Sequence, residues 1–147
     1  MSEDSFHLGV KALLCNASGE ILLLQVNPAR LHGTDRTDYW DLPGGRVQKG
    51  ETIPQTLTRE VFEETGLQDM RATSHIGIVL SNIRIPIGDD SVGLLLSVDA
   101  CQLPVDAEIK LSDEHIARVW FEPAQAAELL AVKYPADFCQ LVANLPA

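Results

Sequence analysis

One helix with both ends marked in its sequence lies between residues 52 and 66, and it constrains the fold more than any other stretch. Thr52 stands where an N-cap is expected, and Gln55 completes a capping box three positions later. Pro54 falls in the first turn, where its missing N–H does no harm. Gly66 stands where a left-handed residue would end the helix. The segments on either side must therefore fold as something other than a continuation of this helix.

Three glutamates crowd the last turns of this helix: Glu60, Glu63 and Glu64. At about 100° per residue, a helical projection places three apolar residues in one stripe that should meet the core: Ile53, Leu57 and Val61. Glu60 and Glu64 fall within or just beside that stripe. Glu63 lies on the same flank, nearer to solvent. Two of the three carboxylates are therefore predicted to be partly buried.

This is an unfavourable place for negative charge. Like charges one turn apart repel by roughly 0.2–0.5 kcal/mol per pair. The helix dipole opposes each carboxylate in the last turn by about 0.3–1 kcal/mol, and partial burial adds a desolvation cost. Arg59 is the only basic residue from Glu51 to Gly66, so the helix cannot neutralise the cluster alone. A solvated acidic face is the alternative, but such a face usually includes lysines and does not border an apolar stripe.

A hard divalent cation would supply the missing positive charge. Mg²⁺ and Mn²⁺ take oxygen ligands, usually a few carboxylates together with waters and substrate phosphates. Just before the helix, Gly44 and Gly45 allow close backbone approach and offer carbonyl groups, although a glycine pair alone is also typical of an ordinary turn. Glu51 could pair with Arg59 or turn towards the metal.

The rest of the chain alternates between strand-like and helical patterns. We expect strands at residues 10–16, 20–26, 74–85, 91–101 and 117–123, and helices at residues 124–134 and 135–145. The turn residues at 16–19 predict a hairpin between the first two strands. Strands before, between and after helices favour an α/β fold in which helices pack on a mixed sheet.

The glycine pair and the helix together resemble the Nudix box of the Nudix hydrolase superfamily, and the chain is similar to its MutT-like members. The fixed positions, in order, are Gly45, Glu51, Arg59-Glu60-Val61, Glu63-Glu64 and Gly66-Leu67. The match is complete over Gly45–Leu67, and a weaker likeness, which includes the preceding WDLP, extends over most of the chain.

The resemblance implies a Nudix-type α/β/α sandwich with a mixed β-sheet, formed by residues 1–147 as a single domain. It implies hydrolysis of a phosphoanhydride bond in a nucleoside diphosphate linked to another group, with Mg²⁺ or Mn²⁺ as cofactor. One alternative is a non-catalytic nucleotide-binding or regulatory domain, which would be expected to lose a box glutamate, and none is missing here. An ADP-ribose pyrophosphatase is the other alternative, within the enzyme interpretation.

Carried over position by position, the resemblance assigns four metal ligands in and just before the box: Gly44, Glu60, Glu63 and Glu64. Arg59 would orient these glutamates through Glu51. The general base stays open, because family members take it either from the box, here Glu60 or Glu63, or from a later loop.

The stretch LSDEHIARVW is expected to be that later loop. Glu114 resembles the glutamate that reaches the metal in some members, as a ligand or as the base. Asp113 and His115 are neighbours that could substitute for it, and His115 alone is more typical of a structural residue. A loop of solvated polar residues is the alternative interpretation.

The substrate is less determined than the reaction. A nucleoside triphosphate or a nucleotide sugar is the default, because features associated with other subfamilies are not evident after the box. Aromatic residues make up only 5% of the chain. Tyr39 is a candidate for stacking on a base, whereas core packing is the expected role of Trp40. Arg36 and Arg84 could meet phosphate or a terminal group.

Composition excludes several classes of protein. The formal net charge is −10 and no basic patch is present, so duplex nucleic acid is not an expected partner. No apolar run approaches the ~18 residues of a membrane span, and the first ten residues lack signal-peptide features. Three cysteines without CxxC spacing predict free thiols in a cytoplasmic protein. Many members of the family dimerise, so a homodimer remains open.

Overall fold

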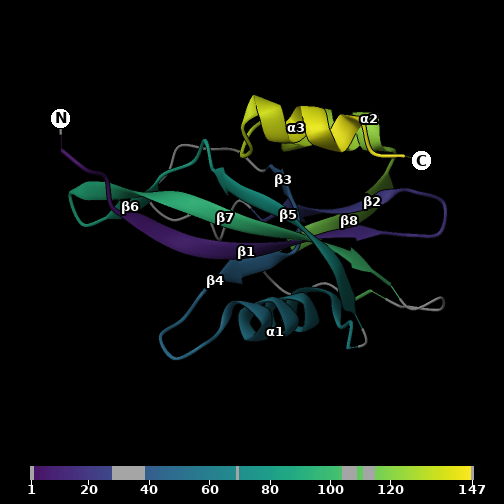
Figure 1. The fold of residues 1–147 in the computed structure, drawn as a ribbon, viewed down its shortest axis with the longest axis horizontal. Coiled ribbons are helices and arrows are strands. Elements are labelled where there is room, and N and C mark those ends of the chain that lie inside the picture. Colours follow the sequence, from purple (N-terminus) through teal and green to yellow (C-terminus); the bar gives the residue numbers. More distant parts are fainter. Residues whose placement is uncertain (1, 28–38, 69, 104–108, 111–114, 147) are drawn as a thin grey trace.

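A mixed sheet lies between two layers of helix in the computed structural model, which describes residues 2–27, 39–68, 70–103, 109–110 and 115–146. Helix α1 (Ile53–Thr65) covers one face of the sheet, and α2 (Pro123–Leu130) and α3 (Ala136–Ala143) cover the other (Figure 1). The predicted α/β/α sandwich is confirmed. No helix within the described ranges is long and apolar enough to span a membrane.

The strands are β1 (Phe6–Cys15), β2 (Ile21–Val26), β3 (Trp40–Asp41), β4 (Gly44–Arg46), β5 (Arg71–Leu80), β6 (Ile85–Ile87), β7 (Asp90–Gln102) and β8 (His115–Phe121). Their main order is β3-β2-β1-β7-β5, while β4 pairs with β1, β8 with β2 and β6 with β7. The long β1 and β7 run parallel, and the other pairs are antiparallel. The predicted hairpin is present, with Cys15 opposite Ile21.

The apolar run of β2 is buried on both faces because helices lie on both sides of the sheet. Ile21 and Leu23 join the cluster under α2 and α3, which includes Tyr134. Leu22 and Leu24 join the cluster under α1. Free cysteines are found at all three predicted positions: Cys15, Cys101 and Cys139.

Helix α1 begins and ends where its sequence predicts. The Thr52 side chain accepts a hydrogen bond from the Gln55 backbone N–H, and the Gln55 side chain accepts one from the Thr52 N–H. Gly66 ends the helix with φ 77°. One expectation is wrong: Ile53 is 39% exposed. Burial begins about one turn later, at Thr56 and Leu57.

Candidate active site

Backbone pairing brings the glycine segment and the end of α1 together. Gly44 in β4 lies opposite Lys11 in β1, and its N–H donates a hydrogen bond to Glu64 Oε1 at 3.2 Å. Glu64 is only 3% exposed. The burial of Glu64 agrees with the helical projection, and the structure adds that its carboxylate lies beside the backbone of the glycine pair.

The glycine pair is needed because side chains would not fit there. A Cβ on Gly44, where φ is 151°, would lie 1.9 Å from the Val10 carbonyl oxygen. A Cβ on Gly45 would lie 2.3 Å from the carboxyl carbon of Glu60. The predicted close approach of the backbone is confirmed, and Glu60 is the side chain that occupies the space at Gly45.

Replacing Gly45 with alanine is expected to lower metal-dependent turnover while leaving the fold intact. The added methyl group would push aside the flexible end of Glu60, which can rotate away without moving backbone. We expect the Mg²⁺ concentration needed for half-maximal activity to rise by about tenfold or more, with Tm nearly unchanged. Gly44→Ala is the matched comparison, because its methyl group would meet backbone and should lower Tm. A normal Mg²⁺ requirement in Gly45→Ala would contradict this placement of Glu60.

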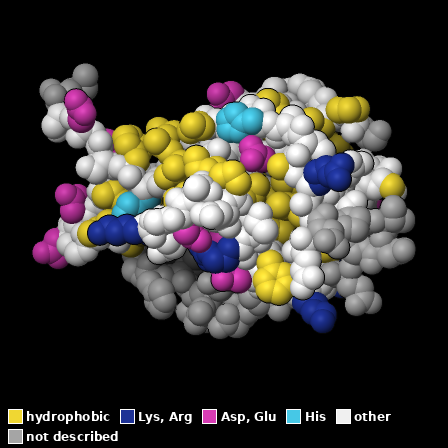
Figure 2. All heavy atoms as spheres, turned by 60° about the horizontal axis from the view of Figure 1, so that its bottom comes forward, with side chains coloured by type: hydrophobic (Ala, Val, Ile, Leu, Met, Phe, Trp, Pro, Cys, Tyr) yellow, Lys and Arg dark blue, Asp and Glu magenta, His cyan; other side chains and the backbone are white. Residues whose placement is uncertain are grey.

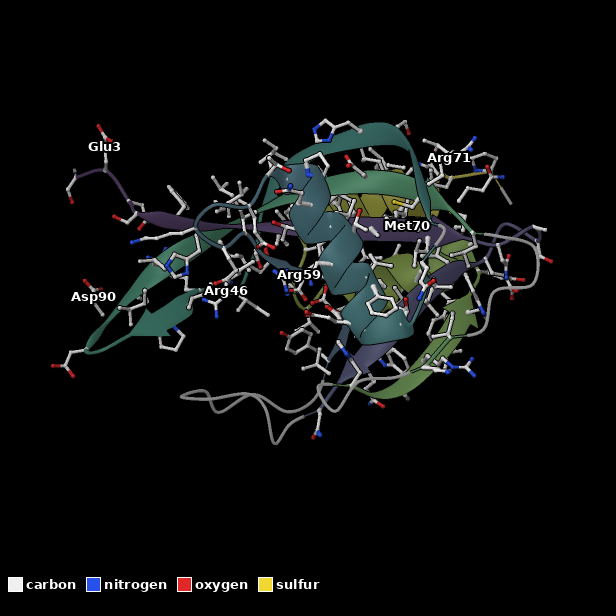
Figure 3. All side chains as sticks on the ribbon, turned by 90° about the horizontal axis from the view of Figure 1, so that it is seen from below. Glu3, Arg46, Arg59, Met70, Arg71 and Asp90 are labelled. Carbon is white, nitrogen blue, oxygen red and sulfur yellow. The ribbon has the colours of Figure 1, made fainter. Side chains whose placement is uncertain are left out.

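Arg59 binds the exposed side of the carboxylate cluster. Its guanidinium donates to both oxygens of Glu51, at 2.7 and 3.0 Å, to Glu60 Oε1 at 2.9 Å and to Glu63 Oε2 at 3.1 Å. Figure 3 shows Arg59 on α1, and Figure 2 shows acidic and basic side chains side by side on the face of the molecule that carries this helix. Hydrogen bonds from Arg59 hold the pKa of Glu51 at about 2. Of the two positions expected for Glu51, the one paired with Arg59 is observed.

Glu64 lies outside the reach of Arg59, in the interior. Burial raises the pKa of Glu64 to about 9, while the charge of Lys11 and the hydrogen bond from Gly44 oppose that rise. The carboxyl group is therefore favoured in its neutral form at neutral pH when no cation is bound. A cation placed against it would restore the ionised form.

Replacing the ionisable carboxyl group of Glu64 should change how the stability of the protein depends on pH when divalent cations are chelated. The folded pKa of Glu64 lies above its ordinary value of 4.5, so between these two values the folded state holds a proton that the unfolded state loses. Stability should then fall as pH rises from about 5 to about 9, by at most ~1.4 kcal/mol per pH unit. We expect Glu64→Gln to remove this decline, as measured by urea unfolding in EDTA at pH 6 and 8.5. Parallel pH curves for the two proteins would contradict the burial of the ionisable group.

His115 is the first residue of β8, not part of a loop as expected. It pairs with Val26 at the end of β2, so strand pairing fixes its position. Its Nε2 lies 3.5 Å from Glu64 Oε2, and its side chain is 7% exposed. Burial, with the charge of Lys11, lowers the pKa of His115 to about 4. Its Nδ1 is buried and has no hydrogen bond to any residue in the described ranges.

A buried polar cluster, which we call the Asp41 cluster, lies behind the glycine pair and was not predicted. Asp41 Oδ2 accepts from Lys11 Nζ at 3.0 Å and from Lys133 Nζ at 2.6 Å. Asp41 Oδ1 accepts from the Tyr134 hydroxyl at 2.6 Å and from the Leu42 N–H at 2.8 Å. Burial raises the pKa of Asp41, but the two lysines outweigh this effect and hold it well below its usual range.

The candidate substrate residues are spread over the molecule. Tyr39 is half-buried, and the Lys133 ammonium lies 5.7 Å from the centroid of its ring. Arg84 forms an ion pair with Asp4 at 2.7 Å and hydrogen bonds with Ser91, which fixes it beside the β6–β7 hairpin. Trp40 packs edge-to-face on Phe121, as expected of a core residue. Arg36, Asp113 and Glu114 lie outside the described residues.

The donor set near Gly44 fits a hard divalent cation. Across the described part of the chain, no three His, Cys, Asp or Glu side chains form a ready-made metal cage. Mg²⁺ does not need one, because it is commonly held by one or two carboxylates with waters and substrate phosphates. Glu60 and Glu64, one turn apart and both against the glycine backbone, could provide those carboxylates. Gly44 could provide a carbonyl oxygen.

Comparisons with known proteins give a family match and solved structures of similar fold. The NUDIX domain family model matches residues 5–141. The crystal structure of a MutT protein from Methanosarcina mazei Go1 is 28% identical with a TM-score of 0.69, and the match covers 97% of this chain and 94% of that one. A C. elegans Ap4A hydrolase shares the fold at 20% identity and a TM-score of 0.69, covering 92% of each chain.

Curated relatives match the chain over a shorter region. An RNA pyrophosphohydrolase from Edwardsiella ictaluri is 34% identical over 67 residues, which are 46% of this chain and 33% of the relative. The mouse 8-oxo-dGDP phosphatase NUDT18 is 41% identical over 58 residues, 40% of this chain and 16% of the relative. The matched region thus spans a third or less of the length of these two relatives.

Proposed function

The chain belongs to the NUDIX domain family, and from this premise we propose that it is a metal-dependent pyrophosphohydrolase. It would hydrolyse a phosphoanhydride bond in a nucleoside diphosphate linked to another group. The observation that carries the proposal is the arrangement of Glu60 and Glu64 around the glycine backbone, with Arg59 holding the outer carboxylates. A regulatory domain would have no need to keep this arrangement complete.

The metal ligands in this proposal are the Gly44 carbonyl oxygen and the carboxylates of Glu60 and Glu64, with Glu63 beside them. A bound Mg²⁺ or Mn²⁺ would polarise a phosphoryl oxygen and lower the pKa of a water molecule. The protein's own contribution is to fix these oxygens before substrate arrives. Gly44 holds Glu64 by a backbone hydrogen bond, and Arg59 holds Glu60 by a side-chain one.

Glu63 is our candidate for the general base. Its side chain is 53% exposed, whereas that of Glu60 is 15% exposed and lies against Gly45. A base must reach the attacking water within hydrogen-bond distance, and an exposed carboxylate beside the metal ligands is suited to this. Arg59 limits the positions that Glu63 can adopt. Glu114 stays the alternative, as a ligand or as the base.

We propose a nucleoside triphosphate or a nucleotide sugar as the substrate. The mouse relative is named for the nucleoside diphosphate 8-oxo-dGDP, and this name supports a nucleotide as the substrate. Tyr39 is proposed to contact the base, because it lies next to the Asp41 cluster rather than in a separate part of the molecule.

A substrate panel tests the proposed function. The purified chain, with Mg²⁺, would be given common and oxidised nucleoside triphosphates, UDP-sugars, ADP-ribose and dinucleoside polyphosphates. Release of a nucleoside monophosphate, phosphate or pyrophosphate is the readout. Turnover that is lost in Glu63→Gln or Glu64→Gln would support the proposal. The absence of turnover on every nucleotide, or unchanged turnover in both variants, would refute it.

A further inference from the structure

Two buried ammonium groups share one carboxylate oxygen in the Asp41 cluster. Lys11 and Lys133 are 6% and 7% exposed, and both donate to Asp41 Oδ2. Lys11 also donates to the Leu42 carbonyl oxygen at 3.2 Å. Within the described ranges, Asp41 is the only hydrogen-bond acceptor of the Lys133 ammonium. Because Asp41 also binds Tyr134 and Leu42, its acceptor capacity is taken up, and Lys133 retains N–H donors to offer.

Structural pairing alone does not account for the second lysine. Removing an ion from water is costly, and a buried ion is usually matched by an opposite charge. The positive charge of one lysine would be enough to balance the negative charge of Asp41. The neighbouring carboxylate, Glu64, cannot balance the other in the working site, because there it is a proposed metal ligand. Burial lowers the pKa of Lys133 to about 8, with Asp41 opposing the shift and Lys11 adding to it. Among the residues that the structure describes, the cluster therefore has two cationic side chains, Lys11 and Lys133, for the one carboxylate of Asp41.

His115 belongs to the same polar surface, which we call the wall and which consists of Lys11, Lys133, His115 and Tyr39. Its buried Nδ1 has no hydrogen-bond partner within the described ranges. The charges of Lys11, Asp41 and Lys133 all act on its ring, which places it beside the cluster. On its other side, its Nε2 lies 3.5 Å from Glu64. Buried polar atoms normally have a hydrogen-bond partner, so this nitrogen calls for one. A ligand that lies against the surplus donors would be close enough to provide it.

The wall extends from Lys11, beside the proposed metal site, to the aromatic ring of Tyr39. Lys11 lies opposite Gly44 in the β1–β4 pairing, and the Lys133 ammonium faces the ring of Tyr39. A substrate whose phosphates lie at Gly44 and Glu64 would therefore place its next portion along this wall. The donors are almost closed off from solvent, and a phosphate would have to lose most of its hydration to reach them. The edge of a planar nucleobase would have to lose much less of its hydration to reach the same donors.

We propose that Lys133 is a specificity-determining residue that donates a hydrogen bond to a carbonyl oxygen of the substrate's nucleobase, with Lys11 and Asp41 holding it in place. This inference rests on the proposed function, since it requires the phosphates to lie at the metal site. A lysine donates and cannot accept. Keto bases such as guanine and uracil should therefore be preferred over adenine and cytosine, which carry an amino group at the corresponding position.

Equilibrium binding of nucleoside monophosphates tests the proposal without relying on turnover. These compounds contain no phosphoanhydride bond, so they can be titrated calorimetrically in Mg²⁺ buffer. We expect GMP to bind about tenfold more tightly than AMP, or UMP about tenfold more tightly than CMP. Lys133→Met should bring that ratio close to one, and Lys49→Met, at an exposed lysine, should leave it unchanged. Inorganic pyrophosphate, titrated in parallel, should bind both variants as it binds the parent protein.

Three outcomes overturn the proposal. If a folded Lys133→Met variant keeps the keto preference, the lysine has only a structural role. If it loses affinity for pyrophosphate and monophosphates alike, the wall binds phosphate instead. Absence of a keto preference, or of any binding, in the parent protein also refutes it. Should Lys133→Met fail to fold, Tyr134→Phe removes one hydrogen bond from Asp41 and should reduce the preference. A keto preference without hydrolysis of any nucleotide would refute the proposed function and leave the recognition intact.

Discussion

Replacing Glu64 with glutamine is expected to lower kcat for nucleotide hydrolysis by about a thousandfold. Glutamine keeps the shape of the side chain and can still accept the hydrogen bond from the Gly44 N–H. It cannot supply the negative charge that a buried metal ligand provides. Charge stabilisation by a bound metal ion amounts to several kcal/mol, and each 1.36 kcal/mol corresponds to a factor of ten in rate. Steady-state kinetics with saturating Mg²⁺ would measure the loss.

Two controls separate this effect from a general loss of structure. Glu128→Gln changes an exposed glutamate on α2, on the far side of the sheet, and should leave kcat unchanged. The Tm of Glu64→Gln in EDTA should be at least that of the parent protein at pH 8, because the variant no longer buries an ionisable group. A drop of less than tenfold in kcat would contradict the proposal that Glu64 is a metal ligand.

Short-range patterns in the sequence were sufficient to predict where α1 begins and ends within the Nudix box. The capping residues of α1 and the glycine before Leu67 depend on neighbours a few positions away, so they can be recognised without the fold. The same short stretch allowed two positions for Glu51, and the structure shows the one in which Glu51 pairs with Arg59. Ile53 shows the limit of this reasoning, because helical periodicity gives the face of a helix but not how far the sheet extends beneath it.

The contacts that complete the site depend on residues far apart in the chain. Asp41 binds Lys11 across 30 positions and Lys133 across 92. One signal was available, since Lys11 interrupts the apolar strand VKALL, and a lysine inside a buried strand requires an anion. Its partner could not be identified without the sheet register. His115 was misplaced for a similar reason, because its pairing with Val26 is what makes it part of a strand.

Replacing Asp41 with asparagine is expected to destabilise the protein by about 3–5 kcal/mol, the usual effect of removing one partner from a buried ion pair. Asparagine has nearly the same shape, so the core around it should stay packed. Lys11 and Lys133 would then be buried without a counter-charge, and the Tyr134 hydroxyl would lose its charged acceptor. Urea unfolding at pH 7 would measure the difference. A loss below about 1 kcal/mol would indicate that water reaches the cluster.

The pH dependence of that loss provides a second, independent check. The folded pKa of Lys133 is about 8, below its ordinary value of 10.5, so above pH 8 the folded state holds fewer protons than the unfolded state, and stability rises with pH. Without Asp41, the folded pKa of Lys133 should fall further, since Asp41 is what raises it. The variant then sheds this charge at lower pH, and the stability gap to the parent protein should narrow between pH 6 and pH 9. A gap that is constant over this range would mean that Lys133 stays charged without Asp41, and that another group in the wall supplies its counter-charge.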